Sequence, residues 1–197
     1  MDNAVALVRA YLQLNGYFTI TEYPVLRREE GSIRTLTEVD VAAFHLPYGE
    51  PDYAPDPALH VPHDRADMII GEVKEGGARL NAGARDPVVL RAALVRFGCC
   101  TAEEADRVVS GLLNQGHAMT RAGHRIRLVV FGSTLEEGGA QRFHFVPLGQ
   151  VVRWLQGHMA EHWELIRHSQ TKDSVLSFLL TMEKARRGTS RSRGVEQ

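Results

Sequence analysis

The sequence predicts an α/β fold in which a mixed central sheet is flanked by helices. Apolar residues recur at helical spacing over 3–14, and the extended runs at 17–26 and 32–44 are joined by RREEG, which indicates a hairpin. A third apolar strand at 67–75 is separated from the strand at 125–132 by helical segments. Because a helical crossover returns the chain in the parallel sense, the hairpin and the crossover together predict a mixed sheet with helices on its faces.

The helices between these strands have recognisable first turns. Asp86-Pro87 opens one helix, since proline suits the first helical position. Thr101 and Glu104 form a capping-box signature for the next helix. We therefore expect two helices in the crossover.

The end of the chain adds a strand at 142–148 and helices at 149–167 and 173–186. We expect a single domain over 1–187, because the composition is that of one globular unit with 44% hydrophobic residues. The polar tail at 188–197 is expected to be disordered.

The charges nearly cancel, with 23 Lys and Arg against 24 Asp and Glu. This balance excludes a uniformly basic nucleic-acid coat but leaves room for a local basic surface over an acidic metal site. No apolar run reaches about 18 residues, so no membrane partner is expected. Cys99 and Cys100 are adjacent and cannot close a loop, and the first residues lack a signal-peptide pattern. We therefore expect a cytoplasmic protein.

Residues 46–66 contain five prolines and little apolar periodicity, which indicates an insertion. We expect it to leave from and return to the neighbourhood of the candidate site, where it can cover bound substrate. Its acidic residues are expected to face outward or to touch a protein partner, and its aromatic residues to contact nucleic acid. The acidic residues are Glu50, Asp52, Asp56 and Asp64, and the aromatic ones are Tyr48, Tyr53 and His63.

The candidate chemistry lies in Asp40, Glu72 and Lys74. Two carboxylates that converge from neighbouring strands form an oxygen site suited to Mg²⁺. A lysine two residues from one ligand can stabilise a phosphodiester under attack or orient the attacking water. The set predicts metal-assisted phosphodiester hydrolysis. The alternative is a solvated strand face on which Glu38, Asp40 and Glu72 form ion pairs with Lys74 and Arg34.

The arrangement resembles the PD-(D/E)xK nuclease superfamily, whose restriction-endonuclease-like core runs helix, three strands, helix, strand. Asp40 in TEVDV matches the family's single Asp, and Glu72-Val73-Lys74 in IIGEVKEG matches its (D/E)xK triplet. The resemblance covers residues 3–132. It implies that Asp40 and Glu72 bind Mg²⁺ or Mn²⁺, that the Val73 backbone carbonyl is a further ligand, and that Lys74 assists the water.

The first helix lacks the Glu that some family members contribute as an extra ligand, so Glu22 and Glu38 are the candidate auxiliary ligands. Arg79 and Arg85 follow Lys74 and are candidates for holding a nucleic-acid backbone. DNA is the expected substrate, and a homodimer or a protein partner is compatible with a chain of this size. The runner-up is an inactive nuclease-fold module that serves as a nucleic-acid-interaction or protein-interaction subunit.

A rival pattern lies in the helix that begins at residue 149. His158, Glu161 and His162 match the H-x-x-E-H arrangement of inverted zinc proteases, in which two histidines share one metal and the Glu is the base. Both histidines fall inside the apolar arc of the helix. Hydrogen-bonded core histidines are therefore the competing interpretation.

Overall fold

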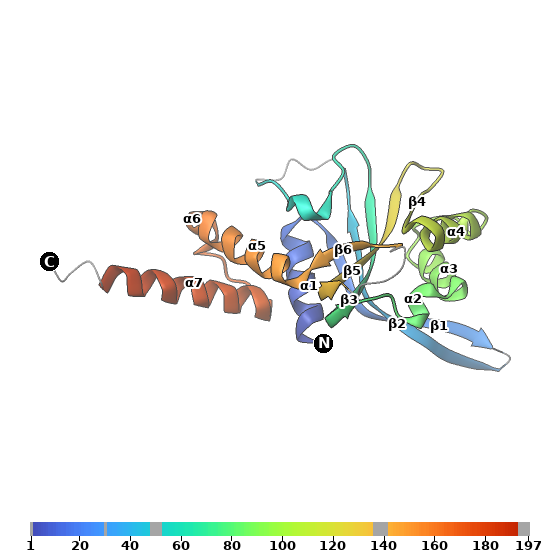
Figure 1. The fold of residues 1–197 in the computed structure, drawn as a ribbon, viewed down its shortest axis with the longest axis horizontal. Coiled ribbons are helices and arrows are strands. Elements are labelled where there is room, and N and C mark those ends of the chain that lie inside the picture. Colours follow the sequence, from blue (N-terminus) through green and yellow to red (C-terminus); the bar gives the residue numbers. More distant parts are fainter. Residues whose placement is uncertain (1, 30, 48–52, 136–141, 193–197) are drawn as a thin grey trace. The chain divides into compact units, whose positions relative to one another are not determined.

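A computed structural model describes residues 2–29, 31–47, 53–135 and 142–192. The chain divides into two compact units, Met1–Leu148 and Gly149–Gln197 (Figure 1), where the sequence predicts one domain over 1–187. The candidate site lies entirely in the first unit.

The helices and strands of the first unit follow one another in the predicted order. Its elements are α1 (Asn3–Leu14), β1 (Phe18–Glu29), β2 (Ser32–His45), the 3₁₀ helix η1 (Pro57–Leu59), β3 (Asp67–Ala78), α2 (Ala82–Arg85), α3 (Pro87–Arg96), α4 (Ala105–Gln115), β4 (His117–Met119), β5 (Arg125–Leu135) and β6 (His144–Pro147). Both β4 and α2 are additions to the prediction.

The strands form one sheet in the order β1-β2-β3-β5-β4, with β6 also pairing with β5. β1, β2 and β3 are antiparallel neighbours, whereas β5 runs parallel to both β3 and β6. The helices α3 and α4 lie in the connection between β3 and β5. The predicted α/β class, a mixed sheet flanked by helices, is confirmed.

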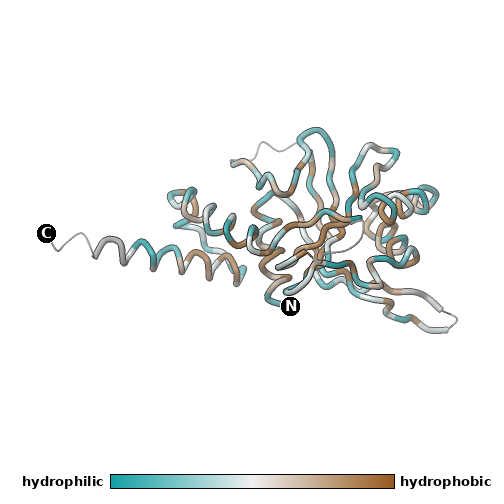
Figure 2. Tube along the Cα trace, viewed as in Figure 1, coloured by the Kyte–Doolittle hydropathy of each residue, from teal (hydrophilic) through white to brown (hydrophobic). Residues whose placement is uncertain are grey.

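Apolar side chains pack on both faces of this sheet. One face meets α3 and α4 in a cluster that includes Ile70, Leu90, Leu112 and Leu128. On the other face the rings of Tyr11 in α1 and Phe131 in β5 meet edge to face, with centroids 6.5 Å apart. Figure 2 shows the apolar stretches along the central strands. The sheet is therefore buried between helices, which leaves its strand ends as the places for polar chemistry.

The two predicted helix starts differ in outcome. The Asp86 side chain caps α3 by accepting from the backbone N–H of Val88 at 2.8 Å. The capping box at Thr101 is wrong, because α4 begins at Ala105 with no side-chain cap. Glu104 is buried instead and accepts from the backbone N–H of Arg121 at 2.9 Å. The Glu104 carboxylate thus stabilises the turn before β5.

The second unit contains α5 (Leu148–Glu161), α6 (Trp163–Ile166) and α7 (Ser174–Ser192). The single helix predicted over 149–167 is interrupted at His162. The tail predicted to be disordered is helical as far as Ser192, and 193–197 lie outside the described residues. None of the helices in the described part of the chain is long and apolar enough to span a bilayer.

Candidate metal and nucleic-acid site

The candidate site lies where β2 and β3 separate. Their antiparallel ladder runs through five pairs, from His45↔Asp67 to Val41↔Gly71. Asp40 and Glu72 are the next residue on each strand. Because opposed residues of an antiparallel pair share one face, the register brings the two carboxylates side by side.

Gly71 permits this close approach of the two strands. A Cβ atom at that position would lie 2.4 Å from Cγ1 of Val41 and 3.4 Å from the ring of Phe131. Any other residue would therefore push β3 away from β2 at the last pair before the carboxylates.

The backbone is irregular at the level of Asp40 on two strands. Val39 and Ala42 belong to the same core cluster although residues three apart in a regular strand point to opposite faces, so β2 departs from regular alternation here. In β1, Glu22 has a φ of 51° and lies between the pairs Thr21↔Val41 and Tyr23↔Val39. Such irregularities re-aim side chains next to functional sites.

Asp40 is held by the neighbouring strand. Its Oδ2 atom accepts a hydrogen bond of 2.8 Å from the backbone N–H of Val73. In an extended strand the N–H and C=O of one residue point to the same side. The Val73 carbonyl therefore also faces the opening between β2 and β3, as a ligand on that side would require.

Glu72 is buried, with 4% of its surface exposed, and Lys74 is its counter-ion at an Nζ to Oε1 distance of 2.5 Å. Burial raises the pKa of the Glu72 carboxyl above its ordinary value; the Asp40 charge raises it further, while Lys74 and the Asn81 side chain lower it. The net direction is upward. One lysine thus leaves part of the negative charge of Asp40 and Glu72 uncompensated.

This imbalance fits a divalent cation, which would bring more positive charge between Asp40 and Glu72 than Lys74 does alone. No group of three or more His, Cys, Asp and Glu side chains in the described ranges is arranged to hold a metal. The protein's ligands would therefore be two carboxylates and a backbone oxygen, completed by water, which is a set that Mg²⁺ accepts.

The predicted auxiliary and basic residues lie on β1, on β2 and in the chain that follows β3. The carboxylate of Glu22 accepts from the backbone N–H of Asp2 at 3.1 Å, at the start of α1. Glu38 is exposed and lines a small cavity together with Glu72. Arg79 and Arg85 are exposed, the first between β3 and α2 and the second at the end of α2.

The described residues of the 46–66 insertion lie away from the carboxylates, contrary to the prediction. It joins His45 to Asp67, at the far end of a five-pair ladder, which corresponds to about 17 Å from the site. Asp56, predicted to face outward, is buried and accepts from the Tyr11 hydroxyl at 2.8 Å. Leu59 of η1 is also fully buried. This part of the insertion is packed on the first unit, and Tyr48, Glu50 and Asp52 lie outside the described residues.

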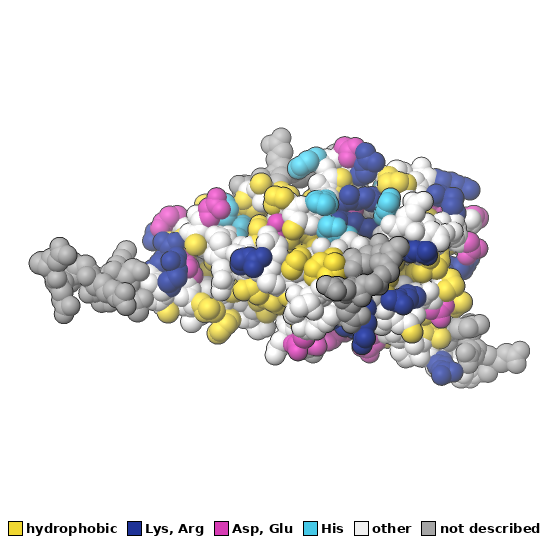
Figure 3. All heavy atoms as spheres, in the orientation of Figure 1, with side chains coloured by type: hydrophobic (Ala, Val, Ile, Leu, Met, Phe, Trp, Pro, Cys, Tyr) yellow, Lys and Arg dark blue, Asp and Glu magenta, His cyan; other side chains and the backbone are white. Residues whose placement is uncertain are grey.

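A buried ionic cluster at that far end was missed by the sequence analysis. Asp67 accepts from Arg125 at 2.6 Å, from Arg127 at 2.7 Å and from the Tyr17 hydroxyl at 2.6 Å. Burial alone would raise the pKa of Asp67, but these partners bring it below its ordinary value. Figure 3 shows histidine and basic side chains gathered over this end of the sheet. The sequence did contain a signal for this cluster. Two arginines occur in RIRL, on a strand that runs parallel to one beginning with Asp67.

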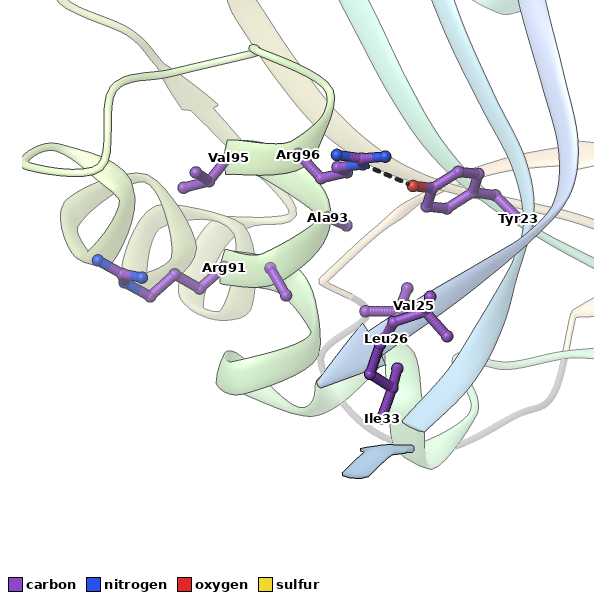
Figure 4. Close-up of a pocket in the computed structure, with 9 residues that line it drawn as sticks. Tyr23, Val25, Leu26, Ile33, Arg91, Ala93, Val95 and Arg96 are labelled. Carbon is purple, nitrogen blue, oxygen red and sulfur yellow. Dashed lines mark hydrogen bonds between the residues drawn. The ribbon is translucent and has the colours of Figure 1, made fainter. Parts of the chain in front are cut away.

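An apolar groove of about 490 Å³ lies between α3 and the β1-β2 hairpin, away from the carboxylates. Figure 4 shows Leu26 and Ile33 on its strand side and Arg96, which donates to the Tyr23 hydroxyl at 3.0 Å, at one end. Nothing in the structure indicates what occupies it.

The histidine rings of the rival zinc pattern contact one another at an interplanar angle of 50°. The rings of His158 and His162 have centroids 4.5 Å apart, and Trp154 stacks on His158 at 4.8 Å. Burial lowers the pKa of His158 to about 4. These three rings thus form an aromatic cluster, and a zinc peptidase stays a prediction.

Comparison of the chain with protein-family models, with curated proteins and with solved structures gave no match.

Proposed function

We propose that this protein hydrolyses phosphodiester bonds of nucleic acid, with DNA as the expected substrate, in a divalent-metal-dependent reaction of the PD-(D/E)xK type. The observation that carries the proposal is the meeting of Asp40, Glu72 and Lys74 where β2 and β3 separate.

The topology supports the same proposal. A helix, three antiparallel strands, a helical crossover and a parallel strand follow one another in the first unit. The restriction-endonuclease-like core runs helix, three strands, helix, strand, so this order supports assigning that core as part of the proposal. A fold alone does not imply an activity, so the proposal depends on the side chains of Asp40, Glu72 and Lys74.

The residues have distinct roles in the proposed reaction. A bound Mg²⁺ or Mn²⁺ would polarise the phosphodiester and lower the pKa of a water. Asp40 and Glu72 would hold the ion, with the Val73 N–H fixing the orientation of Asp40. Lys74, about one-third exposed, can turn from Glu72 to the phosphate or the attacking water. Its positive charge would then stabilise the negative charge that develops there.

The test is a cleavage assay on linear single-stranded and duplex DNA, circular and branched DNA, and RNA, with Mg²⁺, with Mn²⁺ or with excess chelator. We expect metal-dependent cleavage that is lost in Asp40→Asn. Glu75→Gln is the matched control, because Glu75 is an exposed carboxylate on β3, three residues after Glu72. Cleavage in chelator, or by Asp40→Asn at the wild-type rate, would contradict the proposal.

The direct Lys74 to Glu72 contact favours one alternative, a nuclease-fold module that binds nucleic acid or protein without cleaving. In that case the lysine is a permanent counter-ion. Retained nucleic-acid binding with no cleavage of any substrate in either metal would support this alternative. A homodimer would present two sites to the two strands of a duplex, which light scattering on the purified protein tests directly.

A further inference from the structure

A second cleft of about 380 Å³ lies next to the proposed site. Its apolar walls are Leu80, Leu112, Leu113 and Leu128, and its remaining lining is Arg85, Arg142 and Phe143. Leu80 also lines the small cavity that contains Glu72. The two spaces therefore share Leu80 as a wall.

Two arginines from distant parts of the sequence line this cleft. Arg142 donates from Nη1 to the backbone oxygen of Leu113 at 3.2 Å, which places its guanidinium at the cleft wall. Neither Arg85 nor Arg142 forms an ion pair with any described residue. Both side chains are exposed, so within the described ranges the cleft offers an anion two positive charges that no ion pair compensates.

The position of Arg142 is set by the end of α4. Gly116 has a φ of +75°, and a Cβ atom there would lie 2.7 Å from the backbone carbon of Arg142. The chain before β6 thus passes directly against the helix end. This contact brings Arg142 and Phe143 to the cleft.

The lining combines positive charge with an aromatic ring. Phe143 is partly buried, and the leucines give the cleft an apolar interior. A volume of about 380 Å³ is within the range of sites for small ligands. A planar apolar group joined to anionic groups matches this lining, and a nucleotide has both parts.

We propose that Arg85, Arg142 and Phe143 form a binding subsite for one unpaired nucleotide of a single-stranded nucleic acid. The arginines contact backbone phosphates and the Phe143 ring stacks on the base. In a duplex the bases are stacked on one another and present only their edges, so an aromatic contact favours a single strand. The subsite deepens the proposed nuclease function, on which its role in substrate selection depends.

The experiment measures binding of a fluorescein-labelled oligodeoxythymidine to the full chain by fluorescence anisotropy in excess chelator. We expect Arg85→Ala and Arg142→Ala each to weaken binding and to reduce the slope of log K against log salt by about 0.7. Phe143→Leu keeps an apolar side chain but loses the ring, so it should weaken binding by about 5- to 100-fold. Arg121→Ala, which removes an exposed arginine from the turn before β5, is the charge-matched control and should bind as the parent does. Circular dichroism of each variant checks the fold.

The subsite is refuted if folded Arg142→Ala and Phe143→Leu bind the oligonucleotide as tightly as the parent. Tighter binding of the matched duplex, with the same dependence on Phe143, would overturn the single-strand assignment. The nuclease function can fail separately. If no substrate is cleaved but oligonucleotide binding still depends on Arg142, the nuclease function is contradicted and the subsite is retained. Conversely, cleavage with an unchanged KM in both variants would remove the subsite and leave the nuclease.

Discussion

Oδ2 of Asp40 accepts the backbone N–H of Val73 at 2.8 Å, immediately beyond the last backbone pair between β2 and β3. A side chain thus takes over from the main chain in holding the two strands together. The same bond fixes the orientation of Asp40 beside the buried Glu72. Asp40 therefore has two roles at the point where β2 and β3 separate: it holds the strands together, and it is a candidate metal ligand. The two roles predict different effects of substitutions.

Lys74 should act on the chemical step. Lys74→Met should lower kcat by about 10²-fold or more with little change in KM, because the positive charge is needed mainly in the transition state. Lys74→Arg should recover only part of the rate, since a planar guanidinium does not replace a compact ammonium. Steady-state kinetics on the best substrate measure both. A rise in KM of that size with an unchanged kcat would assign Lys74 to substrate binding instead.

Metal binding should be visible without any substrate. A ligand that binds only the folded state stabilises it by about 2.7 kcal/mol at a concentration one hundred times its Kd. Mg²⁺ or Mn²⁺ should therefore raise the Tm of the parent and of Glu75→Gln, but not that of Asp40→Asn. The check is thermal unfolding at increasing metal concentration. An equal shift in all three proteins would place the ion elsewhere.

The buried Glu72 carboxylate should reduce stability at neutral pH in metal-free buffer. Its pKa is raised in the folded state, so folding favours the protonated form and the stability it contributes is lost as pH rises through the raised value. Glu72→Gln should then be more stable than the parent at about pH 7, by about 0.5–2 kcal/mol. The difference should shrink as pH falls below 4.5, the ordinary value of the group. Urea unfolding at both pH values decides, and a less stable variant at neutral pH would indicate a structural ion pair with Lys74.

The Asp67 cluster should dominate the stability of the first unit. Asp67→Ala leaves Arg127 buried and unpaired, which costs about 3–5 kcal/mol. Asp106→Ala breaks only the exposed pair with Arg91 and should cost at most about 1 kcal/mol. Denaturant unfolding of both variants provides the comparison. Because the pKa of Asp67 is lowered, its stabilisation is complete above the ordinary carboxyl range and is lost as pH falls through the folded-state value.

The described part of the insertion should behave as structure rather than as a substrate cover. Asp56→Ala removes the acceptor of the Tyr11 hydroxyl and of the Ala58 N–H, so it should destabilise the protein by about 1–3 kcal/mol. Asp64→Ala changes an exposed carboxylate in the same insertion and should lie within about 0.5 kcal/mol of the parent. Unfolding curves test both. An Asp56→Ala variant with the same free energy of unfolding as the parent would mean that η1 is not anchored through this bond.

Short-range features of the fold were readable from the sequence. The first helix occupies the predicted 3–14, and Asp86 caps α3 as its position before Pro87 indicates. The Glu72-x-Lys74 spacing also holds both side chains on one face of a strand. These features depend on periodicity and on caps, which involve residues a few positions apart. The capping-box pattern at Thr101 failed because Glu104 found distant partners in Arg121 and Arg107.

Long-range pairing was decided by the tertiary structure alone. The register of β2 against β3 puts Asp40 beside Glu72 and sends the 46–66 insertion to the opposite end, although the sequence fits either placement. The approach of Arg142 to the cleft that Arg85 lines, like that of Arg127 to Asp67, also joins residues far apart in the chain. A local pattern carries no information about which strand end or helix end a distant residue meets. Those meetings follow from the packing of the whole sheet, in which a shift of one residue would reverse every side chain of the strand.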